Sequence, residues 1–533
     1  MRSGRTRSLW ATLRQGENRL ASHVEIDTRS LAVFRILAGL LVVVDVFARS
    51  RNFRQFYTED GLVPQWLARE AISFPASVHF VSADPAVAAA LFVLTGLVGV
   101  QLLVGYRTRL ATALAFVLVV SFDLRNPFVL SYADTLFAAL LFWGLFLPLG
   151  ERWSVDAVYA DREPRGSVAS LASAFVLFQM VYMYVRNGYL KTQSDAWTTG
   201  EAAAIVLGLD NITFLFGDLT REVPMFLQFG GLLWFAMLLS AWLLVVLHGR
   251  SRLPLLALFF AGHAAFALTV RIGAFPYVAF LGLVCFFQPS HWADGERIAR
   301  RLGFDGFRYQ RTARRLRRVA ERLPYPRYVH PTIETLARRA HALAVGLVVA
   351  TLVLSLVVTH LPLGAAVGAA AGPEERIESV TDPAGLPQPE WSIFAPNPRS
   401  DDVYYVFAAE TETGDLVDVY GDRPLAWDRP VEPLHLQYET YRERFYMNSI
   451  SDAGYDREPH STDGVLAETL CETWADEDGN GLVRISMYEI RERVTMETLD
   501  SPDERERRTI HLSDHACDGT DPERIAAPAN LTE

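Results

Sequence analysis

The sequence predicts an all-α polytopic membrane domain of about nine transmembrane helices, followed by a β-rich extracytoplasmic C-terminal domain. Half of the 533 residues are hydrophobic and the mean hydropathy is +0.15, which is too apolar for an ordinary soluble chain. The charge is also divided unevenly. Residues 362–533 contain 37 Asp plus Glu against 14 Arg, whereas the rest of the chain has a net positive charge. The apolar, basic first part and the acidic second part are therefore different kinds of domain.

The membrane domain begins after a basic leader, residues 1–30. This leader lacks a hydrophobic region with a small-residue cleavage site, so we expect it to be retained in the cytoplasm. Further along, apolar runs such as "AVAAALFVLTGLVGVQLLV" approach or reach the roughly 20 residues that cross a ~30 Å hydrocarbon core. The first eight predicted spans form the main transmembrane domain, 31–292, and the ninth is a last transmembrane helix. The predicted spans are 31–48, 85–105, 109–124, 133–149, 168–186, 225–247, 253–271, 272–288 and 341–361.

The positions of the arginines predict the orientation of these spans. With the leader inside, the cytoplasmic segments "YRTR", "GERWSVDAVYADREPRG" and "HGRSR" carry much of the arginine of the membrane region, as the positive-inside rule requires. An odd number of spans in this multi-pass cell-membrane protein then places the acidic domain, residues 362–533, outside. The loops at 49–84, 124–133 and 187–224 are expected on that same outer side.

Residues 293–340 form a further cytoplasmic segment that is amphipathic and rich in arginine. Such a segment either lies as a helix on anionic lipid head groups or binds nucleic acid. No nucleic-acid motif accompanies these arginines. We therefore expect the lipid bilayer as the partner of this segment, and no nucleic acid.

The acidic tail contains alternating stretches such as "DDVYYVFAAET" and "LVRISMYEIRERVTMETL", separated by Gly, Asp and Pro, which predict strands. Its acidic surface, in a chain where arginine nearly replaces lysine, is typical of a halophilic protein. Because Cys285 lies in a span, Cys471 and Cys517 are the only candidates for a disulfide in the oxidising exterior. The sequence leaves open whether these two cysteines are joined.

Four ionisable residues lie inside or at the start of predicted spans, where charge is costly and often functional. Arg35 and Asp45 are ten residues apart on one helix, about 15 Å along its axis, so each must find another partner. Both residues have a structural alternative, as interhelical pairs or as end groups that reach the head groups. His263 is either functional or a neutral histidine hydrogen-bonded between helices. Asp134 is expected to cap the start of its helix.

Lys191, in "NGYLKTQSDAW", is the only lysine among the 50 Lys plus Arg residues. Unlike arginine, lysine can lose its proton when it is desolvated, so at the membrane boundary it can serve as a neutral general base. The alternative is that codon bias makes lysine rare and that this one extends to the outer head groups. Position alone does not decide between the two.

Several motifs, taken in order, resemble vitamin K-dependent gamma-glutamyl carboxylase and its prokaryotic relatives, the horizontally transferred transmembrane domain (HTTM) family. "SLAVFRILAGLLVVVDV" is similar to the first-span motif of the family, with Arg35 and Asp45. "NGYLKTQSDAW" resembles its Gly-x-x-Lys followed by a tryptophan, with one extra residue before Trp197. "GHAAFALTVRIGAFPYV" resembles a histidine, here His263, nine residues before an Ile-Gly-x-Phe-x-Tyr-Val helix. "EWSIFAPNP" is similar to the segment that opens the extracytoplasmic part.

The resemblance implies a reaction and a cofactor. Lys191 would deprotonate a reduced naphthoquinone, vitamin K or a menaquinol-like molecule, and the anion would react with oxygen. The resulting strong base would remove a γ-proton from a glutamate of an exported protein or peptide, which then captures carbon dioxide. His263 would help to bind or polarise the quinol or the glutamate. In the carboxylases a histidine near the start of the fourth span assists the lysine, but the corresponding stretch here is "SYADTL", which contains Asp134.

Two classes of function are therefore expected. The first is an integral membrane enzyme that uses a quinol and oxygen, either to carboxylate glutamate or only to oxidise the quinol. The second is a non-catalytic membrane scaffold that presents the acidic domain to an extracellular partner. The chain has no CxxC, HExxH, P-loop or GxSxG motif, so no metal, phosphate or acyl-transfer site is expected.

Overall fold

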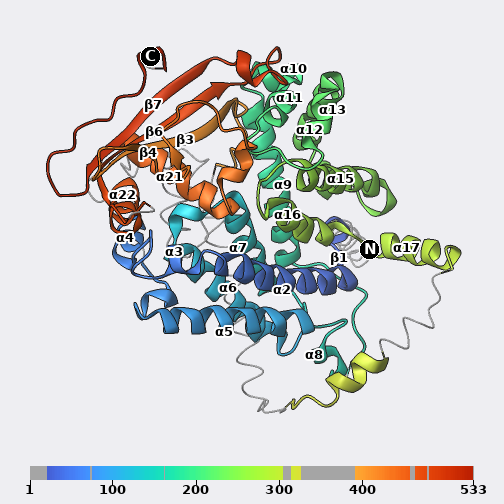
Figure 1. Ribbon diagram of the computed structural model, residues 1–533. Helices are drawn as coiled ribbons and strands as arrows, with labels where there is room; N and C mark the ends of the chain where they lie inside the picture. The colour runs from blue at the N-terminus through green and yellow to red at the C-terminus, as the bar shows by residue number, and fades with distance from the viewer. Residues whose placement is uncertain are drawn as a thin grey trace, which may run out of the picture.

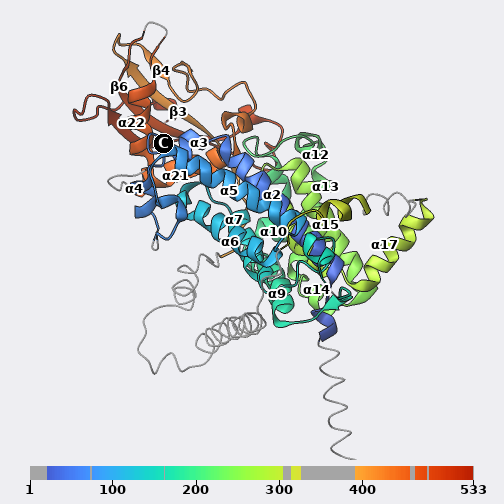
Figure 2. The same cartoon turned by 90° about the horizontal axis from the view of Figure 1, so that it is seen from below.

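The computed structural model describes residues 21–72, 75–160, 162–303, 314–325, 390–456, 462–476 and 479–531. The predicted span 341–361 and most of the predicted leader lie outside these residues. Figure 1 shows a helical first part and a sheet-containing C-terminal part, and Figure 2 shows the sheet and α17 at opposite ends of the helical part.

The first part of the chain is mostly helical. A helix lies at each of the eight predicted spans that the structure describes. By length and composition, three stretches can cross a membrane, namely Thr28–Ser50, Pro85–Val104 and Gly249–Thr269. The helices are α2 (Thr28–Ser50), α3 (Phe53–Tyr57), α4 (Gln65–Glu70), α5 (Pro85–Val104), α6 (Thr108–Arg125), α7 (Tyr132–Gly144), α8 (Val155–Val158), α9 (Leu171–Lys191), α10 (Asp195–Thr199), α11 (Glu201–Leu207), α12 (Gly217–Arg221), α13 (Pro224–Leu239), α14 (Leu243–Val246), α15 (Leu253–Thr269), α16 (Phe275–Leu283) and α17 (Pro289–Arg301).

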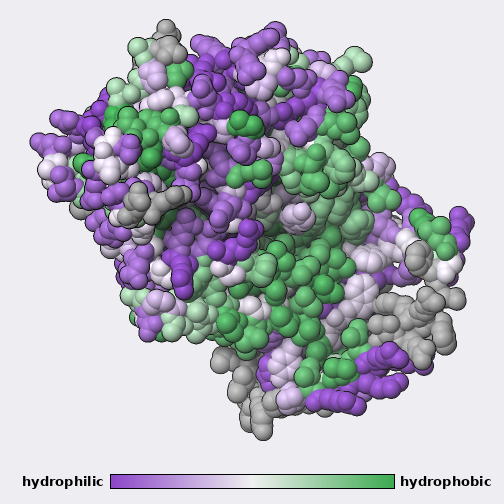
Figure 3. All heavy atoms as spheres, in the orientation of Figure 1, coloured by the Kyte–Doolittle hydropathy of each residue, from purple (hydrophilic) through white to green (hydrophobic). Residues whose placement is uncertain are grey.

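Large apolar side chains cover the outside of this helical part. Phe47 of α2, Leu97 of α5 and Phe229 of α13 are 72%, 62% and 66% exposed. Figure 3 shows hydrophobic residues gathered over these helices, while hydrophilic residues cover the C-terminal part. A soluble protein rarely leaves so wide an apolar surface uncovered, whereas lipid tails cover it at no cost. The helical part therefore belongs to a membrane protein.

Glycines bring α2 and α5 into close contact. A Cβ atom at Gly39 of α2 would lie 2.4 Å from the backbone nitrogen of Leu103 and 2.6 Å from the carbonyl oxygen of Gly99. The two backbones therefore approach as small residues allow in membrane helices. α5 itself begins where the Asp84 side chain accepts from the amide of Ala86, and it ends at Gly105, whose φ of 70° is left-handed.

The C-terminal part contains an antiparallel five-stranded sheet of order β5-β4-β3-β6-β7. The alternating stretches quoted above form β3 and β6, so the β-rich prediction is correct for the strands. Two helices, α21 and α22, cover one face of the sheet, and the sequence analysis missed both. The bounds are β3 (Asp401–Thr411), β4 (Leu416–Asp418), β5 (Arg423–Pro424), α21 (Tyr441–Asp456), α22 (Thr462–Thr473), β6 (Leu482–Arg493) and β7 (Arg507–Ala516); a short pair, β1 (Ile26–Asp27) and β2 (Ser167–Val168), lies in the helical part.

One apolar core joins the sheet to the helical part. Tyr405 and Phe407 of β3 and Tyr446 of α21 share a buried cluster with Phe56 of α3 and Phe122 of α6. The C-terminal part is therefore packed against the segments that follow α2 and end α6, and both faces of β3 are buried.

The structure joins Cys471, on α22, to Cys517, just after β7, in a disulfide with 5.4 Å between the Cα atoms. The bridge closes a loop of 46 residues in sequence separation. A loop of this size predicts a loss of about 2–4 kcal/mol of stability when both cysteines become serine. The melting temperature of the purified chain should fall, and a reducing agent should lower it in the wild type alone. An unchanged melting temperature in the double variant would contradict a stabilising bridge.

Candidate functional site

Lys191 is the last residue of α9 and is only 1% exposed. Its Nζ donates hydrogen bonds to the carbonyl oxygens of Ile393, at 2.6 Å, and Phe394, at 3.1 Å. It also lies 4.1 Å from the centre of the Trp197 ring. No carboxylate contacts this amine among the described residues. The amine is therefore surrounded by dipoles and an aromatic face, without an opposing charge.

Two neighbours of Lys191 hold the same short segment, residues 391–394. Asn187, one helical turn earlier, donates its Nδ2 to the carbonyls of Trp391, at 2.7 Å, and Ile393, at 3.0 Å. The indole nitrogen of Trp197 donates to the carbonyl of Phe394 at 2.8 Å. We call Asn187, Lys191 and Trp197 the carbonyl clamp, because all three side chains bind backbone carbonyls of this segment.

His263 lies fully buried in the middle of α15. Its Nε2 is 2.8 Å from the hydroxyl of Tyr184 on α9, while its Nδ1 is buried without a hydrogen-bond partner. Tyr184 precedes Lys191 by seven residues, about 10.5 Å along the helix. Aromatic rings surround the imidazole, those of Tyr184, Trp234, Phe266, Phe275 and Phe280. The predicted lysine thus ends α9, while the predicted histidine lies on α15 and contacts α9 through Tyr184; no contact between Lys191 and His263 is recorded.

Arg35 of α2 is buried and binds only backbone carbonyls among the described residues, so its contacts are structural. Its guanidinium donates to the carbonyls of Leu149, Arg152 and Trp153, at 3.2, 2.9 and 2.6 Å. These residues belong to the loop between α7 and α8. As predicted, Arg35 and Asp45 do not pair with each other. Asp45 instead binds Arg49 and Arg442 toward the C-terminal end of α2.

Asp45 and Asp134 meet in a buried ionic network. Arg49, fully buried, contacts Asp45 at 2.7 Å, Asp123 at 2.7 Å and Asp134 at 3.2 Å. Arg442 of α21 reaches the same group, at 2.5 Å from Asp45 and 2.9 Å from Asp134. We call these five residues the two-arginine network. It joins α2, α6 and α7 to the C-terminal part.

Asp134 takes part in capping α7, but the N-cap residue is Ser131 and not Asp134, contrary to the prediction from the sequence. Its carboxylate accepts from the backbone amide of Ser131 at 2.8 Å, and the two residues form a capping box. Both tasks turn this carboxylate toward Ser131 and the two arginines. The described contacts of Asp134 do not include Lys191.

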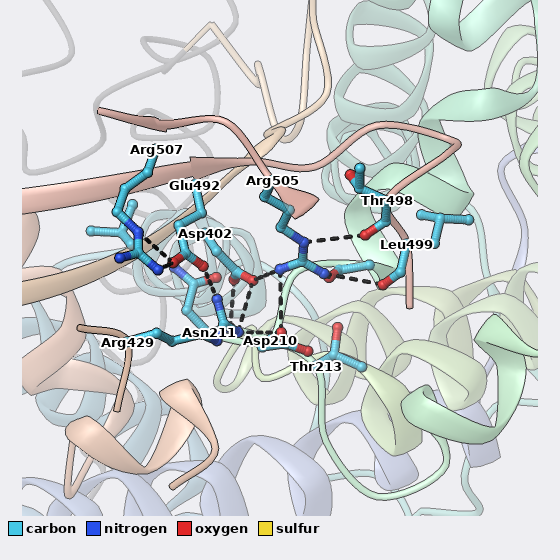
Figure 4. Close-up of polar contacts among 12 residues, drawn as sticks. Asp210, Asn211, Thr213, Asp402, Arg429, Glu492, Thr498, Leu499, Arg505 and Arg507 are labelled. Carbon is cyan, nitrogen blue, oxygen red and sulfur yellow. Dashed lines mark hydrogen bonds and ion pairs between the residues drawn. The ribbon is translucent and has the colours of Figure 1, made fainter. Parts of the chain in front are cut away.

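A second ionic cluster holds the loop after α11 against the sheet (Figure 4). Asp402 of β3 accepts from the amide of Asn211 at 2.9 Å and from Arg505 at 2.5 Å. Arg429 contacts both Asp210 and Glu492, and Arg507 contacts Glu492 at 3.0 Å. Each of these three arginines has a carboxylate partner. The cluster is therefore a compensated structural joint, which fixes the chain that follows Trp197.

A cavity of about 350 Å³ lies beside the carbonyl clamp. Residues 392–395 form one of its walls, and the carbonyls of Ile393 and Phe394 in this wall are those that Lys191 binds. Neither Lys191 nor His263 lines the cavity. The start of α7, the 272–275 segment and α21 complete the lining.

Residues 23–292 match the family model of the HTTM domain, which is half of the chain. The chain belongs to the HTTM family. No curated protein and no solved structure matches the sequence. The HTTM domain contains Asn187, Lys191, Trp197 and His263, but it ends before Trp391 and Arg442. The carbonyl clamp and the two-arginine network therefore join the HTTM domain to chain that lies beyond it.

Three residues of these contacts were not predicted from the sequence, namely Asn187, Tyr184 and Arg442. Tyr184, Asn187 and Lys191 are spaced by three and four residues, which places them on one face of a helix, so the pattern was available in the sequence. Arg442 gives no such signal, because its partners Asp45 and Asp134 are about 300 to 400 residues away in the chain.

Proposed function

We propose that this HTTM protein is a quinol-dependent membrane enzyme that carboxylates glutamate side chains of an exported protein, with Lys191 as its general base. The observation that carries the proposal is the environment of Lys191, a buried amine bound by two carbonyls and contacted by no carboxylate of the described part of the chain. A residue held for charge pairing alone would be expected to have an anionic partner in so buried a position.

The two carbonyls match the neutral form of the amine. A neutral primary amine has two N–H groups and one lone pair, and the carbonyls of Ile393 and Phe394 can accept both N–H groups. The lone pair then remains free to take a proton from an acidic hydroxyl, as a general base must. An arginine in this position would keep its proton.

The residues around His263 have the chemical character that a reduced naphthoquinone requires. His263 offers a buried Nδ1 without a partner, and the aromatic rings around it suit a flat apolar molecule with a hydroxyl group. The cofactor, when bound, would supply with oxygen the strong base that takes a γ-proton from glutamate before carbon dioxide adds. In this proposal His263 holds a cofactor hydroxyl through Nδ1, and Tyr184 fixes the orientation of the imidazole.

We further propose the multi-pass topology with the C-terminal part outside the cell. Its contacts support this side. The C-terminal part packs on α3, on the end of α6 and on the loop after α11, all within segments predicted outside. Tyr106 and Tyr159, in segments predicted inside, instead bind residues 323 and 324 of the Arg-rich segment.

The test is oxygen uptake by the purified full-length chain in detergent. With a reduced naphthoquinone, we expect uptake accompanied by quinol oxidation, and incorporation of labelled bicarbonate into an added glutamate peptide. Uptake without incorporation would restrict the activity to quinol oxidation. No uptake under any condition would overturn the proposal and leave the scaffold that presents its acidic domain to a partner.

A further inference from the structure

The cavity beside the carbonyl clamp carries a positive charge in the most acidic part of the chain. Among its described lining residues are two arginines, Arg399 and Arg444, and no Asp or Glu. Residues 362–533 as a whole have 37 Asp plus Glu against 14 Arg. The lining of this cavity therefore differs from its acidic surroundings, which include Asp401, Asp452 and Glu489 in the adjoining groove that Arg399 also borders.

Arg444 lies in the first turns of α21 and is 5% exposed. One of its terminal nitrogens donates to the carbonyl of Arg271 at 3.1 Å, while its Nε is buried without a partner. None of the ion pairs among the described residues includes it. Burial, and then the nearby charge of Arg399, lowers the pKa of Arg444 to about 9, which leaves the guanidinium charged at neutral pH.

Arg399 stands on the opposite wall, two residues before β3, and is half-buried. Its side chain makes no hydrogen bond or ion pair among the described residues. This contrasts with the joint in Figure 4, where Arg429, Arg505 and Arg507 each have a carboxylate partner. Unlike the arginines of that joint, Arg399 and Arg444 have no carboxylate partner among the described residues, so both can bind an anionic ligand from outside.

The rest of the lining has the character of a binding site for a short side chain. Apolar groups come from Phe275, Phe394 and Phe445, and amides come from Asn397 and Asn448. Asn448 lies one helical turn after Arg444 on α21, so the two side chains share a face of that helix. Apolar walls with a few convergent polar groups are typical of a site that holds methylene groups and orients a charged end.

We propose that this cavity binds the carboxylate of a peptide side chain, with Arg444 and Arg399 as the recognition residues. The identification of that carboxylate as the substrate glutamate rests on the proposed function. The cavity adjoins a polar groove of about 400 Å³ that shares Pro398, Arg399 and Asn448 with it. The peptide backbone lies along this groove, and one acidic side chain enters the cavity.

The segment at 391–395 contacts both Lys191 and the proposed carboxylate site. Lys191 binds this segment through its carbonyls, and side chains of the same segment line the carboxylate site. The wall therefore separates the clamp from the substrate by a single stretch of backbone. In this arrangement Arg399 and Arg444 are positioning residues for the peptide and take no part in proton transfer.

The test is calorimetric binding of two capped pentapeptides to the full-length chain at fixed salt, one with a central glutamate and one with glutamine. We expect the glutamate peptide to bind about 10- to 100-fold more tightly, as a pair of charge-assisted hydrogen bonds implies. R399Q and R444K should each remove most of that difference. The control R508Q removes an exposed arginine of β7 and should leave both affinities unchanged.

Equal binding of the two peptides by the wild type would overturn the proposal, as would unchanged discrimination in R399Q. R399Q is the decisive variant. Arg444 also holds the Arg271 carbonyl, so its replacement can disturb folding, whereas Arg399 has no such contact. Oxygen uptake is measured separately. Quinol-dependent uptake without glutamate selectivity would reject the carboxylate site alone, and selectivity without uptake would reject the proposed enzyme while the site remains.

Discussion

Replacing Lys191 with arginine is expected to reduce quinol-dependent oxygen uptake by about 100-fold or more, which is the contribution of a general base. Arginine retains a positive charge, and its fork of N–H donors can still reach the carbonyls of Ile393 and Phe394. It can also stack on Trp197. The substitution therefore keeps the features of a clamp and removes only the ability to lose a proton. Initial rates of uptake, at saturating quinol, measure the effect.

The companion variant is K191M, which removes both the charge and the hydrogen bonds. A general base predicts that K191R and K191M are both inactive while K191R keeps the wild-type melting temperature. A purely structural clamp predicts the opposite for K191R, with uptake retained. Full activity in K191R would thus refute the base role and assign Lys191 to holding the segment at 391–394.

The helical part could be predicted from local pattern. Long apolar runs satisfy their own backbone hydrogen bonds as helices, and a helix lies near each of the eight predicted ranges that the structure describes. The motif around Lys191 and the HTTM match likewise depend on residues that are close in the sequence. The N-cap of α7 was predicted at Asp134, three residues after the actual N-cap Ser131, because both residues belong to one capping box.

The C-terminal part was harder to predict because its structure depends on distant contacts. Alternation identified β3 and β6, but α21 carries two arginines that contact the helical part, which weakens its apolar spacing. The Trp391 carbonyl meets Asn187 across 204 residues of chain. Loop closure of that length leaves no local signal, so neither the carbonyl clamp nor the cavity beside it follows from sequence.

The two-arginine network leads to the largest expected effect on stability. R442M would leave Asp45, Asp123 and Asp134 with Arg49 as their remaining partner, and it would also free the Val129 carbonyl that Arg442 binds at 3.2 Å. Removing one member of a buried ionic group typically costs about 3–5 kcal/mol, because uncompensated charge remains in a poorly solvated place.

We expect R442M to lower the melting temperature of the purified chain and to expose the 390–531 region to protease, since this arginine joins that region to α2 and α7. The double variant R442M/D134N should recover part of the loss, because it removes one of the stranded carboxylates, and the difference gives the coupling between the two residues. R508Q serves as the matched control for the loss of one exposed arginine. If R442M and R508Q have the same melting temperature, solvent compensates the charges of the network. The apolar cluster around Phe56 and Tyr446 must then hold the two parts together by itself.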